Sequence, residues 1–251
     1  MAKHRIGSVG TGLCLVAAVL AACGSTKTGA PSASSTTTTT AAPSTKAGDA
    51  ALAAEELLPA SAFPAGWKGQ GAASKNSGAS FFGGSSSADV NQIVSCLGMS
   101  SAHVDANPVE DAGQEYDDPN SDLTVTDTVD VFPSTIDAVT DVEAGANPKT
   151  PTCLVQLEGP QITKALPQGS TAGQLSAEDA SLPSDGSHHA ALLIHFPFTY
   201  QGVSATLYLE FVVVQKDRSE SNLAFDDADS PPPASVVNAL ALAAANRLRT
   251  S

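Results

Sequence analysis

Acidic and histidine side chains are the first residues in this sequence whose types and spacing could do chemistry. Six acids lie between residues 110 and 122, and Asp118-x-Asn120-x-Asp122 follows the opening spacing of a calcium-binding loop. An EF-hand needs glycine at the sixth position and glutamate at the twelfth, where this chain has Leu123 and Val129. We therefore exclude an EF-hand and interpret the acids as a solvated loop.

Three histidines stand close together at positions 188, 189 and 195. In an extended strand His189 and His195 would lie about 20 Å apart, which is too far for one metal ion. The sequence also lacks the G-x-S-x-G, Walker, H-E-x-x-H and G-x-G-x-x-G motifs of common enzyme sites. We expect no metal, no cofactor and no catalytic residues.

The N-terminus carries an export signal. A basic start at Lys3–Arg5 precedes ten uncharged, mostly apolar residues, Leu13 to Ala22, a stretch too short to span a membrane. We therefore predict that residues 1–22 form a signal peptide. It ends in Leu20-Ala21-Ala22-Cys23.

These four residues resemble the bacterial lipobox. The resemblance implies that Cys23 becomes the diacylglyceryl-modified (palmitate-type) N-terminus of a lipoprotein, held on the extracytoplasmic face of the cell membrane. Two acyl chains bury enough methylene groups for stable attachment. The alternative is an ordinary secretory signal that leaves Cys23 as a free thiol.

Cys96 and Cys153 are the cysteines that remain once Cys14 leaves with the signal peptide and Cys23 carries lipid. An even pair in an oxidising compartment favours one disulfide. A shared metal is the rival interpretation, but it needs more ligands, and neither cysteine has a C-x-x-C or histidine neighbour.

Residues 23–50 have the composition of a disordered tether. From residue 24 onward they contain thirteen serines and threonines but no aromatic residue and no Val, Ile, Leu or Met, so little apolar surface offsets the entropy of ordering. The threonine run is either an O-glycosylated stalk or a plain spacer. The mature chain would carry 10 basic and 26 acidic residues, which excludes nucleic acid and disfavours anionic lipid as partners.

We predict one globular α+β domain over residues 51–251, an antiparallel β-sheet flanked by helices. Period-2 alternation predicts a strand over 123–131 and two strands joined at Gln201-Gly202 as a hairpin. Helical spacing predicts helices over 89–99, after Ser134 and after Pro233. We expect two further short helices, 152–157 and 161–166, separated by Gly159-Pro160.

The order Phe63-Pro64-Ala65-Gly66-Trp67, then Cys96-Leu97, Val131-Phe132-Pro133-Ser134 and Cys153-Leu154 resembles a broad group of actinobacterial, mycobacterial-type exported lipoproteins. That group includes domains similar to PsbP-like proteins and to the extracellular sensor domain of a mycobacterial serine/threonine kinase. The resemblance implies a PsbP-like α/β/α sandwich over about residues 50–250, with a cleft and no catalytic machinery. This chain has one cysteine pair where the kinase domain has two.

Two functions therefore remain. The first is a non-enzymatic domain that binds a small amphiphile, an envelope glycan or an envelope protein, with Trp67 as a candidate stacking residue. The second is an envelope glycan hydrolase that uses buried carboxylates. Its candidate is Asp127, a single polar residue on an otherwise apolar strand face. An isolated buried aspartate is more often structural, so we favour the binding domain.

Overall fold

The computed structural model describes residues 45–74, 87–100, 108–166, 168–183, 187–228 and 230–249. The predicted signal peptide, Leu20, Ala21, Ala22 and Cys23, and most of the predicted tether lie outside these residues and stay predictions. The helices are α2 (Lys46–Glu56), α3 (Ser87–Leu97), α5 (Thr135–Gly145), α6 (Thr150–Ala165) and α7 (Ala234–Arg247), with a 3-10 turn η1 (Ala60–Ala62). The strands are β1 (Lys68–Ser74), β2 (Glu110–Asp117), β3 (Thr124–Val131), β4 (Ser170–Ala172), β5 (Ser176–Asp179), β6 (His188–Tyr200), β7 (Val203–Lys216) and β8 (Ser219–Ala228).

All eight strands join one antiparallel sheet in the order β1-β2-β3-β8-β7-β6-β4, with β5 also paired to β6. The long β6–β7 hairpin turns at Gln201 and Gly202, as predicted, and both residues have positive φ (52° and 82°). Two positive φ angles in succession match the twist of the flanking strands, and glycine supplies one without steric cost.

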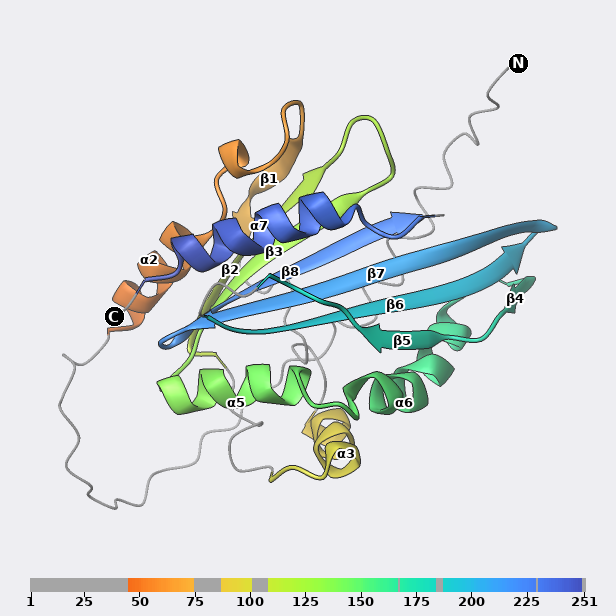
Figure 1. Cartoon of the computed structure of the whole chain (residues 1–251), viewed down its shortest axis with the longest axis horizontal. Helices are drawn as coiled ribbons and strands as arrows, with labels where there is room; N and C mark the ends of the chain where they lie inside the picture. The colour runs from red at the N-terminus through yellow and green to blue at the C-terminus, as the bar shows by residue number, and fades with distance from the viewer. Residues whose placement is uncertain are drawn as a thin grey trace.

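Helices cover both faces of the sheet, so the fold is a three-layered α+β domain (Figure 1). On the α2/α7 face, Val237 and Leu240 of α7 pack on Val212, Leu223 and Phe225 of the sheet. On the α5/α6 face, α6 and α5 cover apolar residues of β6 and β7 such as Leu192, Phe196 and Val213. The predicted antiparallel sheet flanked by helices is therefore confirmed.

Three local predictions were wrong. Helix α2 begins at Lys46, so the last five residues of the expected tether are folded; Thr45 caps this helix by accepting a hydrogen bond from Gly48 N at 3.1 Å. The acidic segment at 110–117, expected to be a solvated loop, is strand β2. Its residues Ala112 and Tyr116 lie on one face of the strand and are buried in the core. The two expected helices near Pro160 are one helix, α6, with Pro160 in its interior.

Packing holds α6 together across the proline. Proline removes one helical hydrogen bond. Before it, Cys153 and Leu157 pack with α3, and after it Ile162 and Leu166 pack against the apolar cluster of β6. No helix in the described part of the chain is long and apolar enough to span a membrane.

Candidate functional site

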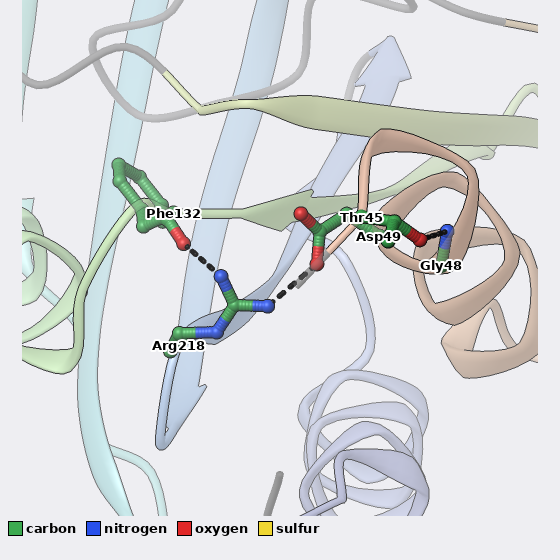
Figure 2. A network of polar contacts seen from close by, with 5 residues as sticks. All are labelled: Thr45, Gly48, Asp49, Phe132 and Arg218. Atoms are coloured by element: carbon green, nitrogen blue, oxygen red, sulfur yellow. Dashed lines mark hydrogen bonds and ion pairs between the residues drawn. The ribbon is translucent and has the colours of Figure 1, made fainter. Parts of the chain in front are cut away.

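A polar network fixes the end of the domain where the predicted tether enters. Arg218, in the β7–β8 turn, donates to the Asp49 carboxylate at 2.6 Å and to the Phe132 carbonyl at 3.0 Å (Figure 2). Asp49 lies in the first turn of α2, next to the cap made by Thr45 and Gly48. This network, the Arg218 anchor, joins the start of α2 to strand ends far away in sequence. We call this end of the domain, where the predicted tether would join it, the attachment end.

Cys96 and Cys153 form a disulfide that joins α3 to α6. Around it Ile93, Val94 and Leu97 of α3 form an apolar cluster with Cys153. The disulfide is therefore a structural cross-link, called the staple below, between α3 and the outer side of α6. Its sulfur atoms are bonded to each other and are not metal ligands.

The structure places Trp67 at the edge of the core on the α2/α7 face. Its ring centroid lies 5.6 Å from that of Phe63, which in turn stacks on Tyr116 at 3.8 Å. Trp67 is partly buried and packs against the main apolar cluster. Its ring neighbour Phe63 is a core residue, so this position favours a packing role.

Asp127 of β3 is completely buried and lies beside Leu58, in the segment that follows α2. Its carboxylate accepts hydrogen bonds from Leu58 N at 2.6 Å and from the Ser221 hydroxyl at 3.2 Å. Burial raises the pKa of Asp127 to about 6, although these hydrogen bonds and the nearby Arg247 act in the opposite direction. A substrate cannot reach this carboxyl, and its geometry is that of a structural residue that holds the chain after α2 on the sheet.

A second surface, which carries hydroxyl and ring side chains, lies at the opposite end of the sheet. Strand β7 runs fourteen residues from Val203 to Lys216, so the β6–β7 turn lies about 45 Å from the Arg218 anchor. In Figure 1 this hairpin extends past the end of α7, and its tip lies away from α2. We define the hairpin platform as the side chains that follow one face of this projecting hairpin and of β4: Thr171, His195, Pro197, Thr199, Ser204, Thr206 and Tyr208.

Strand register places these side chains in rows. Thr171 lies beside Thr199, which pairs with Ser204; Pro197 pairs with Thr206, and His195 pairs with Tyr208. Paired residues in antiparallel strands point to the same side. The rows continue the α2/α7 face of the hairpin, where Ala191 and Val212 lie under α7.

The platform combines hydroxyl groups with flat rings. The Thr199 and Ser204 hydroxyl oxygens are 3.2 Å apart, and the His195 and Tyr208 rings stack with centroids 6.1 Å apart. A hollow of about 330 Å³, open to solvent, lies between β4 and the hairpin and is lined by uncharged residues of both, including Thr171, Pro197 and Thr206. Its size falls within the range of small-ligand sites.

Glu210 lies at the inner end of the platform, two residues beyond Tyr208 on the same face of β7. Its neighbours across the sheet are Leu193 and Phe225, and it is 9% exposed. Burial alone raises the pKa of Glu210 to about 7. Glu210 is not part of the lining of the hollow; on β7 it lies four residues beyond Thr206, which is part of it.

Sequence reasoning missed both the platform and Glu210. The alternation of β6 and β7 predicted a dry and a polar face, but it could not show where α7 ends. None of the described residues forms a group of three or more His, Cys, Asp or Glu side chains suited to a metal ion.

No protein-family model matches the chain, and no curated protein matches it. Among solved structures, the chain is similar to the extracellular domain of PknH from Mycobacterium tuberculosis, with a TM-score of 0.39 and 9% sequence identity. The alignment covers 77% of this chain and 91% of that one. A likeness at this TM-score carries no conclusion about function. The PsbP-like and lipoprotein resemblances stay predictions.

Proposed function

We propose that this chain is an exported lipoprotein whose domain binds a neutral glycan of the cell envelope without catalysis. In this proposal a diacylglyceryl group on Cys23 holds it on the extracytoplasmic face of the cell membrane. The observation that carries the proposal is the hollow on the hairpin platform, which is lined by uncharged residues and lies at the end of the domain opposite the attachment end.

Export is supported by two independent features. The N-terminus reads as a signal peptide with a lipobox, and the domain contains the Cys96–Cys153 disulfide, a bond that persists in oxidising compartments and is rare in the cytosol. A tether attached near Thr45 would leave the platform pointing away from the membrane.

The chemistry of the platform favours a glycan over the other ligands considered. Sugars present hydroxyl groups at their edges and C–H groups on their faces, which suit the hydroxyls of Thr199 and Ser204 and the ring of Tyr208. Anionic ligands are disfavoured because the lining lacks basic residues and the chain carries a net charge of −14. Amphiphiles need a deep apolar cavity, whereas this hollow is open.

The test is a binding titration with the exported chain carrying Cys23→Ser, which removes the lipid site and leaves the rest of the chain intact. The probe is a mixture of neutral oligosaccharides released from the envelope, and binding is followed by calorimetry and by NMR shifts. We expect Tyr208→Ala to weaken binding at least about tenfold, as for the loss of one well-packed aromatic contact.

The matched control is Tyr200→Ala. Tyr200 lies at the same hairpin tip but points to the other face. It is the next residue after Thr199 on β6, and its partner Val203 is five positions from Tyr208 on β7. Equal effects of the two substitutions, or no binding by the unsubstituted chain, would refute the platform as a glycan site.

A glycan hydrolase is the second candidate, and Glu210 is the observation that favours it. A carboxyl with a pKa of about 7 beside a glycan platform has the protonation state of a general acid. Incubation of the same oligosaccharides with the chain, followed by mass spectrometry, decides the point. Shorter products that disappear in Glu210→Gln would replace the binding proposal with a hydrolase, and unchanged oligosaccharides would dismiss the enzyme.

A further inference from the structure

A cluster of three acids, two of them buried and Asp141 half-buried, lies under α5 on the face of the sheet opposite the platform. Asp130 of β3 and Glu220 of β8 are directly paired across the sheet, and they are 3% and 0% exposed. Asp141 reaches the cluster from α5, where its neighbours Ala138 and Val142 are buried against the sheet. These carboxyls thus come from three separate elements.

The polar atoms of this cluster lack the partners that ionised acids require. Asn222 donates to Asp130 at 3.0 Å. Neither carboxyl oxygen of Glu220 nor the Oδ1 atom of Asn222 receives a hydrogen bond from any residue that the structure describes, although all three atoms are buried. A buried carboxylate with no donor is costly. Glu220 avoids this cost when it is protonated and donates to Asp141.

The described charged groups that act on Asp130 and Glu220 through the electric field are acids. Across the sheet, Asp111 of β2 pairs with Asp130 and Gln215 of β7 pairs with Glu220, and His188 of β6 lies beyond Gln215. Burial, then Asp141 and Asp111, raise the pKa of Asp130 to about 8. Burial raises the pKa of Asp141 to about 6, and burial with both other acids raises that of Glu220 well above its ordinary value.

We propose that Asp130, Asp141 and Glu220 form a proton-controlled latch that holds α5 on the sheet while they share protons and releases α5 when the protons leave. The sign follows from linkage: acids whose pKa is higher in the folded state stabilise it at low pH, and this stabilisation is lost as pH rises through the folded pKa. Repulsion among the ionised groups acts between α5 and the sheet. Release would expose the small apolar contact of Val142 with Ala190 and Val213.

Amide hydrogen exchange of the exported chain tests the latch locally. Protection factors, corrected for the intrinsic effect of pH on exchange, are measured for α5 and for α7 at pH 5.5 and 8.5. We expect α5 to lose at least about tenfold more protection than α7 at the higher pH, because the latch acts on α5 in addition to any global loss of stability. Equal protection of α5 at both pH values would overturn the proposal.

Neutral isosteres identify the residues. In Asp141→Asn with Glu220→Gln, α5 should keep its protection at pH 8.5, whereas Glu143→Gln, on the exposed side of α5, should behave like the unsubstituted chain. A double variant that loses α5 protection as before would overturn the latch. If the double variant fails to fold, a carbon-13 titration of Glu220 in the unsubstituted chain decides: a midpoint well above 4.5 supports the latch, and an ordinary midpoint refutes it.

Discussion

Replacing Glu210 by glutamine should make the domain less sensitive to rising pH. Glu210 is buried between Leu193 and Phe225, and its pKa rises from 4.5 to about 7 through burial alone. Its contribution to stability is complete below pH 4.5 and is lost as pH rises through 7. Two and a half pKa units correspond to about 3 kcal/mol, of which about 2 to 3 kcal/mol falls between pH 5 and pH 8.

Urea unfolding at pH 5 and at pH 8 measures this difference. Glu210→Gln resembles the protonated acid, so the variant and the unsubstituted chain should have similar stability at pH 5. At pH 8 the variant should be more stable by about 2 to 3 kcal/mol. The control is Glu178→Gln, an exposed residue of β5 that lies opposite the same Leu193. If Glu210→Gln and Glu178→Gln lose the same free energy of unfolding between the two pH values, the reasoning from burial is wrong.

The remaining predictions concern the staple, the anchor and the buried aspartate. Replacing Cys96 and Cys153 by alanine removes a disulfide between residues 57 positions apart. The loop-entropy model gives a loss of stability of about 4 kcal/mol, which should lower the Tm measured by calorimetry by about 8 to 16 °C. An unchanged Tm would contradict a structural disulfide. Arg218→Met leaves Asp49, 5% exposed, without its ion pair and should cost about 3 kcal/mol and speed proteolysis at α2. The control is Arg249→Met, which breaks an exposed ion pair with Glu55 and should change stability by less than about 1 kcal/mol. If Arg218→Met and Arg249→Met have equal effects on stability, the Arg218 anchor does not hold α2 on the domain. Asp127→Asn should keep both fold and glycan binding, because an amide can accept from Leu58 N and donate to the Ser221 hydroxyl, whereas Asp127→Leu should cost about 1 to 3 kcal/mol in urea unfolding; a large loss of binding in the asparagine variant would return Asp127 to the candidate site.

The parts of the fold that local pattern determines could be predicted from the sequence. Strict alternation with Gly202 at the turn determined the β6–β7 hairpin, because period 2 and a positive φ are local properties. The disulfide followed from counting cysteines in a chain predicted to be exported, since Cys96 and Cys153 were the remaining pair.

The parts that tertiary packing determines could not be predicted. Asp130 stands on the polar face of its strand and therefore reads as solvated, yet α5 covers it. Pro160 reads as a helix break, yet packing on both sides keeps α6 continuous. Likewise β6 and β7 alternate along their whole length, and only the position of α7 separates the buried rows from the hairpin platform.

The most direct test of the account concerns the N-terminus of the chain in its own membrane. Trypsin cuts after Lys27, so a lipoprotein processed at the predicted site yields the peptide Cys23–Lys27 with a diacylglyceryl group on Cys23. Mass spectrometry of the membrane-extracted protein should find this lipidated peptide, and Cys23→Ser should move the protein out of the membrane fraction. An unmodified Cys23, or a mature N-terminus elsewhere, would contradict the lipid anchor and with it the proposed presentation of the platform away from the membrane.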